Sequence, residues 1–257
     1  MTFLATRVIL LRGNERGVVK AIYYDIYKDL RDKIIAGEYP YQSFIPSENS
    51  LVEQYQCTHN TIRKALGVLT NHGFVQPLRG KGVVVIWQHG RRKRFVLGDI
   101  ETFREAVEKN GLSSKTIVRT FEHVEADKTL ASLTGFSVGE KLLHVDRVRQ
   151  IDGVNLILDK SYFLASCVEG LTPQIAEDSI FTYLENVLGM RITTSNRLVT
   201  MKYATAEDRE ALDLLDFDML AVVENSTFNE DGVLFEVTWS RHRPDHFTFM
   251  TTAVRGY

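Results

Sequence analysis

Apolar residues recur every four positions near the front of the chain and predict an amphipathic helix over residues 22–36. The stripe consists of Ile22, Ile26, Leu30 and Ile34. Gly37 follows directly and suits the end of a helix, because glycine adopts the left-handed conformation without strain. Residues 1–20 carry no comparable period, and we expect a disordered N-terminal extension there.

Two shorter helices are expected next, separated by a tight turn. Ser47 is a good N-cap for a helix over residues 48–55. Either Thr58 or Asn60 can cap a following helix that runs to about residue 72. The apolar stripe of that helix consists of Ile62, Ala65, Leu66 and Leu69. Two short helices joined in this way are typical of the helix-turn-helix motif.

A strand, a glycine-containing turn and a second strand follow these helices. Residues 74–78 and 83–86 flank the turn Arg79-Gly80-Lys81-Gly82. Pro77 restricts the first strand to the edge of a sheet. A hairpin directly after a helix-turn-helix is a wing, so the sequence predicts a winged helix-turn-helix domain over residues 21–87. A linker is expected over residues 88–96, which contain the cationic run Arg91-Arg92-Lys93-Arg94.

The rest of the chain, residues 97–257, alternates between helix and strand patterns. Helices are expected over residues 100–109, 128–133, 179–187 and 206–215, and strands over residues 116–124, 142–150, 155–163, 192–201, 220–228, 234–242 and 248–254. Ile151-Asp152-Gly153 and residues 229–232 have the composition of hairpin turns. Hairpins mixed with helices predict an α+β domain with an antiparallel sheet.

The composition is that of a globular protein, with 44% hydrophobic and 25% charged residues. No apolar run approaches the roughly 18 residues that a membrane-spanning helix needs, and no cleavable signal peptide is apparent. Two cysteines suit a reducing compartment and give no disulfide framework. We therefore expect a cytoplasmic protein without a membrane partner.

Charge is distributed unevenly along the chain. Residues 1–95 contain 15 Lys and Arg against 7 Asp and Glu, a net charge of +8, whereas the remaining residues carry a net charge of −10. A basic domain favours a polyanion, and nucleic acid is the most common one. The charge and the winged helix-turn-helix together predict binding to double-stranded operator DNA.

The second short helix would enter the major groove with its N-terminal residues toward the bases. Arg63 is the candidate for a bidentate contact with guanine, and Asn60 for one with adenine. Ser47 stands at a helix start that favours a phosphate, and the wing would reach the minor groove. The candidate DNA-binding residues are Ser47, Thr58, His59, Asn60, Thr61, Arg63, Lys64, Arg79, Gly80, Lys81 and Gly82. The alternative is that these are solvated charges on a small helical domain.

Several motifs resemble those of the GntR family of bacterial regulators. They are Ile45-Pro46-Ser47-Glu48, Thr61-Ile62-Arg63-Lys64-Ala65-Leu66, Gly73-Phe74 and Arg79-Gly80-Lys81-Gly82. The family usually has an arginine soon after Pro-Ser-Glu, where this chain has Asn49 and Ser50. This departure affects one DNA contact of the family.

The rear of the chain is similar to the HutC subfamily, whose members carry a UTRA effector domain with a chorismate-lyase-like fold. The similarity lies in Asp146-Arg147-Val148-Arg149, the strand ending in Asp159, Ser179-Ile180, Phe235-Glu236, Ser240-Arg241-His242-Arg243 and Phe247-Thr248-Phe249. Residues 151–163, 207–214 and 240–243 are most similar to subfamily members that repress trehalose operons. The resemblance implies repression of trehalose uptake and utilisation genes, released by trehalose 6-phosphate, with no cofactor besides this effector.

Arg147 and Arg149 lie two positions apart on an expected strand and therefore point to the same face. From the spacing alone, they either hold an anion between them or form ion pairs with acidic neighbours. The resemblance implies that they bind phosphate together with Thr102, Phe103 and Ser179. It also implies sugar contacts through Asp159 and Glu236 as hydroxyl acceptors, and through His242. The candidate effector-binding residues are Thr102, Phe103, Arg147, Arg149, Asp159, Ser179, Glu236, His242 and Arg243.

The sequence is also compatible with other functions. A regulator of the same family could respond to an amino-sugar phosphate, another disaccharide phosphate or a histidine-pathway acid. An enzyme could use the chorismate-lyase-like fold, but the sequence has no nucleophile motif, and His242 and His246 lack a third metal ligand. As a regulator, the chain is expected to bind palindromic DNA as a homodimer, and the effector would change the spacing of the two DNA-binding domains.

Overall fold

The computed structural model describes residues 22–88, 113–249 and 253. The chain divides into two compact units between Trp87 and Gln88. Several expectations lie outside the described residues: the extension over residues 1–20, all but the first residue of the linker, the helix over residues 100–109, and both Thr102 and Phe103.

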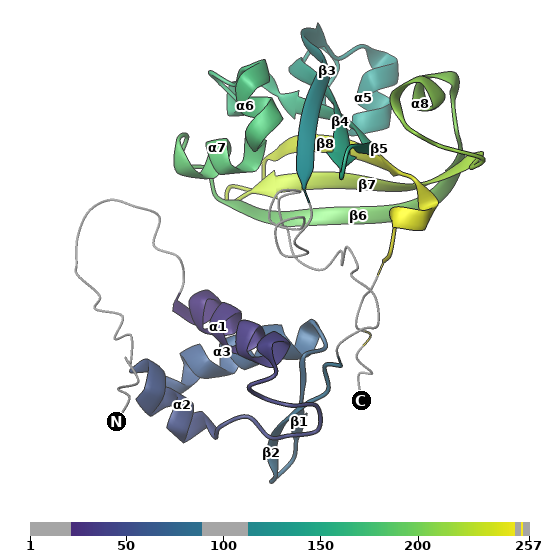
Figure 1. Ribbon diagram of the computed structural model, residues 1–257. Coiled ribbons are helices and arrows are strands. Elements are labelled where there is room, and N and C mark those ends of the chain that lie inside the picture. The colour runs from purple at the N-terminus through teal and green to yellow at the C-terminus, as the bar shows by residue number, and fades with distance from the viewer. Residues whose placement is uncertain (1–21, 89–112, 250–252, 254–257) are drawn as a thin grey trace, which may run out of the picture. The chain divides into compact units, whose positions relative to one another are not determined.

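The described part of the N-terminal unit, from residue 22 on, contains three helices and a hairpin (Figure 1). They are α1 (Ile22–Ala36), α2 (Glu48–Tyr55), α3 (His59–Asn71), β1 (Val75–Leu78) and β2 (Gly82–Val85). The winged helix-turn-helix is confirmed. Ser47 caps α2, and Thr58 rather than Asn60 caps α3, because the Thr58 side chain accepts a hydrogen bond from the backbone N–H of Thr61.

The core of this unit is built from the apolar stripes of all three helices. Leu30, Leu51, Ile62 and Leu69 are fully buried. Each such side chain stabilises the fold by roughly 1.5–3 kcal/mol relative to an exposed one. Ile22 belongs to the expected stripe of α1 but is 50% exposed, so the buried part of that stripe starts one turn later at Ile26.

The hairpin is extended by the chain segment that precedes α2. Phe44 forms an isolated bridge with Val84, and the backbone N–H of Ile45 donates to the carbonyl of Val83. Strand β2 therefore lies between this segment and β1, while β1 pairs with β2 alone among the described strands. Pro77 thus occupies an edge strand, as expected from its missing N–H.

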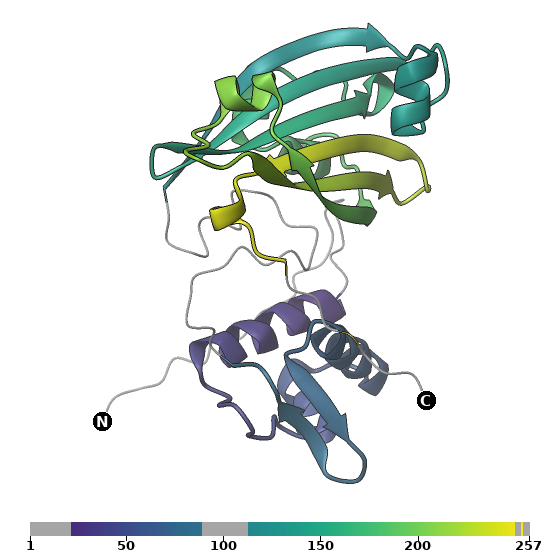
Figure 2. The same ribbon diagram turned by 90° about the vertical axis from the view of Figure 1, so that its right-hand side faces the viewer.

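The C-terminal unit is an α+β domain around one six-stranded sheet with the order β3-β4-β5-β8-β7-β6. Every neighbouring pair is antiparallel, which confirms the expected sheet type. Its described elements are β3 (Ser114–Glu125), α5 (Lys128–Thr134), β4 (Lys141–Ile151), β5 (Val154–Leu164), η1 (Ala165–Cys167), α6 (Pro173–Asp178), α7 (Ile180–Asn186), β6 (Ile192–Tyr203), α8 (Ala206–Ala211), β7 (Met219–Asn229), β8 (Leu234–His242) and η2 (Pro244–His246). Figure 2 shows the twist of this sheet.

The structure differs from the sequence-based expectation at several elements. Helix α6 was not expected. Helix α8 ends at Ala211 instead of residue 215, because Leu212 takes an extended conformation and turns into the core. The last expected strand, over residues 248–254, is wrong where it can be checked: Thr248 and Phe249 belong to no strand. The 3-10 turn η2 begins at a proline and redirects the chain after β8.

Alternation along the strands divides the domain into two apolar layers. Leu142, Val148 and Leu158 pack with residues of α5 and α8 on one face of the sheet. Leu143, Val145 and their neighbours pack with α6 and α7 on the other face, and these two helices lie close together in Figure 1. We call the face that packs with α6 and α7 the effector face, because it carries Arg147 and Arg149, two of the residues expected from the sequence to bind an effector.

Candidate functional site

The start of α3 presents polar side chains to solvent. Of the sequence-predicted residues there, Thr58, His59, Asn60, Arg63 and Lys64 are exposed, and Thr61 is half-buried. The backbone N–H groups of Ser50 and Thr61 are bonded by the Ser47 and Thr58 hydroxyls, which fixes the first turns of α2 and α3. The residues that would read DNA thus stand on two rigidly capped helices.

The wing tip is the second exposed polar element of this unit. Arg79, Gly80, Lys81 and Gly82 are all exposed. Gly80 and Gly82 have φ values of 72° and 110°, in the left-handed region that favours glycine. A cationic tip on so tight a turn can approach a phosphate backbone closely.

On the effector face, the register of the sheet brings the predicted side chains together. Arg147 lies opposite Asp159, and Asp159 lies opposite Ser240 of β8. The Nε of Arg149 donates to Oδ2 of Asp159 at 2.8 Å, and its Nη1 donates to Oγ1 of Thr116 at 2.8 Å. Arg149 therefore has the ion pair that spacing alone left open.

Arg147 is placed differently from Arg149, although both are buried. Its Nη2 lies 3.9 Å from Oδ2 of Asp159, and its Nη1 makes a long hydrogen bond of 3.4 Å to the carbonyl of Ala176. Its Nε is buried and has no hydrogen-bond partner among the described residues. Burial and the charge of Arg149 lower the pKa of Arg147 to about 9.

The acidic side chains compensate the charge of Arg149 better than that of Arg147. Asp159 is shared between the two guanidinium groups and also accepts from the Ser240 hydroxyl at 2.7 Å. The second carboxylate, Glu236, is buried, and its pKa is raised by that burial against the opposing effects of Thr238 and Arg147. A site with an incompletely paired cation and a carboxyl group that tends toward neutrality favours an added anion.

Hydroxyl groups surround Glu236 on the same face. Oγ1 of Thr238 lies 2.8 Å from Oε1 of Glu236 and 2.8 Å from Oγ of Ser161. Thr116, Ser161, Thr238 and Ser240 were not among the predicted site residues. The two on β8 could have been found from the sequence, since they follow Glu236 at intervals of two along a strand.

Of the remaining predicted residues, His242 and Ser179 border the effector face, whereas Arg243 contacts the segment after α8, which packs on the opposite face. His242 is half-buried, its ring lies 5.1 Å from that of Phe247, and burial lowers its pKa to about 4, so the imidazole is neutral at physiological pH. Ser179 caps α7. Arg243 donates to Oδ1 of Asp245 and to the carbonyl of Asp213, and these contacts anchor the end of β8.

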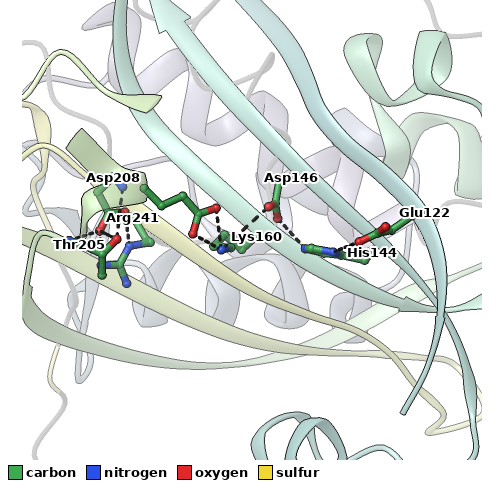
Figure 3. A network of polar contacts seen from close by, with 8 residues as sticks. Glu122, His144, Asp146, Lys160, Thr205, Asp208 and Arg241 are labelled. Atoms are coloured by element: carbon green, nitrogen blue, oxygen red, sulfur yellow. Dashed lines mark hydrogen bonds and ion pairs between the residues drawn. The ribbon is translucent and has the colours of Figure 1, made fainter. Parts of the chain in front are cut away.

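The opposite face of the sheet carries a separate polar network, shown in Figure 3. Oδ2 of Asp146 lies 3.9 Å from Nζ of Lys160, which also binds Glu207 of α8 at 2.7 Å. Asp208 of α8 accepts two hydrogen bonds from the guanidinium of Arg241, at 2.6 and 2.7 Å. These contacts fasten α8 to the sheet, so the network serves the architecture of the domain.

His144 connects this network to the edge strand β3. Its Nε2 lies 2.8 Å from Oδ1 of Asp146, and its Nδ1 lies 3.2 Å from Oε1 of Glu122. Burial disfavours the imidazolium, but the two carboxylates outweigh this effect and raise the pKa of His144. The charged form is therefore favoured in the folded protein.

Replacing His144 by Gln is expected to destabilise the protein more at about pH 6 than at about pH 9. Because folding raises this pKa, the stabilisation is fully present below the unfolded value of about 6.5 and is lost as the pH rises through the folded value. Urea unfolding of both proteins over a pH series measures the difference. His123→Gln, at an exposed position of β3, is the control. A His144 effect that stays constant over the series would contradict the prediction.

Two negative findings concern the described residues only. None of their helices is long and apolar enough to cross a membrane. Their His, Cys, Asp and Glu side chains form no group of three or more that could hold a metal ion.

Comparison with known protein families agrees with this architecture. Residues 22–85 match the bacterial regulatory proteins of the gntR family, and residues 109–248 match the UTRA domain. The chain is 37% identical over 234 residues to the HTH-type transcriptional regulator TreR of Bacillus subtilis, which covers 91% of this chain and 98% of that protein.

Solved structures are similar to the whole chain and to its C-terminal part. The possible transcriptional regulator YydK of Bacillus subtilis superimposes with a TM-score of 0.77 over 89% of this chain and 99% of its own, at 22% identity, and shows the fold. The effector-binding domain of the B. subtilis trehalose repressor TreR is 39% identical, with a TM-score of 0.51 over 56% of this chain and 99% of its own. The chain therefore belongs to the GntR family of bacterial transcriptional regulators, with an N-terminal helix-turn-helix domain and a C-terminal UTRA domain.

Proposed function

We propose that this regulator represses trehalose uptake and utilisation genes as a homodimer and leaves its operator when trehalose 6-phosphate binds the effector face. The similarity to TreR at 37% identity supports this effector over those of more distant relatives. The observation that carries the proposal is Arg147, a buried guanidinium. Its Nε has no partner within the part of the chain that the structure describes, and its nearest carboxylate there is held mainly by Arg149.

A phosphate ester fits this environment. Its oxygens accept from guanidinium groups in bidentate fashion, and its negative charge relieves the repulsion between Arg147 and Arg149. Asp159, Glu236 and the hydroxyls of Thr238 and Ser240 lie on the same face and offer hydrogen-bond partners to sugar hydroxyls. The sugar and the phosphate would thus be recognised by different strands of one sheet.

Release from DNA requires that the effector prefer the state that does not bind DNA. To move a population from 99:1 to 1:99, this preference must be about 10⁴-fold. When an anion binds between Arg147 and Arg149, the electrostatic energy of these two buried guanidinium groups changes. This change can supply part of the preference, because charges interact strongly in a low-dielectric interior.

A gel-shift experiment with the chain's own upstream DNA tests the proposal, at fixed salt because the affinity depends on it. Trehalose 6-phosphate is expected to release the DNA, while trehalose and inorganic phosphate alone are not. Glucosamine 6-phosphate serves as the competing sugar phosphate. If DNA binds and only the amino-sugar phosphate releases it, the regulator stands and the trehalose assignment is wrong.

A further inference from the structure

A carboxylate stands among the basic residues that would face DNA. Glu48 is the first residue of α2, and its Oε2 accepts a hydrogen bond from Nε of Arg63 on α3 at 2.9 Å. The same oxygen lies 3.9 Å from Nδ1 of His59, at the start of α3. One acidic side chain on the first helix of the motif therefore contacts the cationic side chain that is the candidate for reading guanine.

This ion pair is not explained by stability. The Glu48 side chain is 37% exposed and that of Arg63 is 65% exposed. Ion pairs at such exposed positions contribute little to folding, because water and salt screen them. A negative charge on this surface also weakens the attraction to phosphates, which dominates the affinity for DNA. The ion pair between Glu48 and Arg63 must therefore serve something other than stability or general affinity for DNA.

The geometry points to orientation of the guanidinium group. The bond to Glu48 uses Nε, so Nη1 and Nη2 remain available, and within residues 22–88 the structure gives them no other acceptor. Guanine presents two acceptors, O6 and N7, to a bidentate arginine in the major groove. A guanidinium whose plane is fixed from behind through Nε loses less conformational freedom when it makes that pair.

We propose that Glu48 is a specificity-determining positioning residue: it holds Arg63 through Nε so that the two terminal amino groups of Arg63 select guanine at one base pair of each half-site. The inference rests on the proposed DNA-binding function and adds a residue to it. In this proposal, Glu48 increases the discrimination between DNA sequences and decreases the general affinity for DNA.

The opposite signs define the experiment. The full-length protein and its variants are each used to select from a duplex pool with a randomised core, and the selected sequences are compared position by position. Glu48→Ala is expected to lose the guanine preference at one base pair per half-site, which corresponds to a loss of roughly 10- to 100-fold in discrimination. Its affinity for unrelated duplex DNA is expected to rise, because an anion has been removed.

Two further variants separate orientation from charge. Glu53→Gln removes one negative charge from an exposed position of the same helix, so it should raise general affinity without changing the preferred sequence. Glu48→Gln keeps an oxygen that can accept from Nε and should retain part of the guanine preference. In Arg63→Ala the same guanine preference is expected to be lost, and adding Glu48→Ala should cause no further loss at that base pair.

The outcomes distinguish this inference from the proposed function. If the wild-type protein selects no sequence, DNA recognition itself is refuted. If the wild type selects an operator and Glu48→Ala keeps its guanine preference, or weakens binding to all sequences equally, the positioning role of Glu48 is refuted while the regulator stands. Thermal unfolding of each variant confirms that the folded protein is being compared.

Discussion

Arg147→Met is expected to give a regulator that still binds its operator but no longer responds to trehalose 6-phosphate. Charge-assisted hydrogen bonds contribute about 1.5–3 kcal/mol each, so the loss of one predicts an effector affinity that is lower by roughly 10- to 150-fold. Isothermal titration with the effector measures the affinity, and gel shifts measure release. A variant that is released normally would show that the effector site lies elsewhere.

The same substitution is expected to raise the melting temperature of the effector-free protein. Arg147 is 6% exposed, is repelled by Arg149, and has a buried Nε that residues 22–88 and 113–249 provide with no partner. Replacing a poorly compensated buried ion by an apolar side chain of similar volume is neutral or stabilises by about 1–4 kcal/mol. Asp159 keeps its partner Arg149, and Glu236, which loses the favourable charge of Arg147, keeps the hydrogen bond from Thr238.

Arg119→Met is the matched control for Arg147→Met. Arg119 lies on β3 and pairs with the exposed Glu210 at 3.0 Å. This variant should change neither the melting temperature by more than a small amount nor the response to the effector, because exposed pairs contribute about 0–1 kcal/mol. Equal effects of the two substitutions would indicate a general consequence of losing an arginine.

Asp208→Ala is expected to be the most destabilising of the substitutions considered, by about 3–5 kcal/mol. Asp208 is 1% exposed and receives two hydrogen bonds from Arg241, one from the backbone N–H of Thr205 and one from the Thr205 hydroxyl. Its removal breaks the capping box of α8 and leaves the Arg241 guanidinium, which is 12% exposed, without its carboxylate. Urea unfolding measures the free energy of unfolding of both proteins.

The destabilisation caused by Asp208→Ala is also expected to depend on pH. Burial raises the pKa of Asp208, but the hydrogen bonds from Arg241 and Thr205 outweigh burial and hold the pKa below its usual range. The stabilisation by Asp208 is therefore present above the unfolded pKa of about 3.9 and is lost as the pH falls through the folded value.

Glu207→Gln is the control for Asp208→Ala on the same helix. Glu207 is 50% exposed and binds Lys160 on the surface, so its replacement should cost less than about 1 kcal/mol. A comparable loss of unfolding free energy in both variants would show that the capping box and the buried ion pair with Arg241 stabilise the protein no more than an exposed ion pair does.

Much of the fold could be predicted because its local signals agree with one another. The strand pattern of β4 and β5 and the Asp152-Gly153 turn between them specify one hairpin, and the structure contains it. Helix α6 could not be predicted from apolar periodicity, since its six residues cover less than two turns. Its best signal is local: Thr172 caps it and Pro173 occupies its first turn.

Some features of the site could likewise be predicted from local sequence patterns, whereas others depend on contacts between residues far apart in the sequence. The shared face of Arg147 and Arg149 follows from the period of a strand, and Glu236 comes to the same face through the strand order. The difference between the two arginines does not follow from spacing. It depends on which of them reaches Asp159 and on the carbonyl of Ala176, which is 29 residues away from Arg147 along the chain.

Ser179 links α6 to α7, and the hydrogen bonds of its hydroxyl restrict which further group can bind to it. Its oxygen accepts from the backbone N–H of Thr182 at 3.2 Å and from the Thr182 hydroxyl at 2.8 Å. A serine hydroxyl has two lone pairs and one proton, so both acceptor positions are used and only the proton remains to be given. An approaching group must therefore be a proton acceptor, such as a phosphate or carboxylate oxygen, and an ammonium group of similar size would be turned away by hydrogen-bond polarity alone.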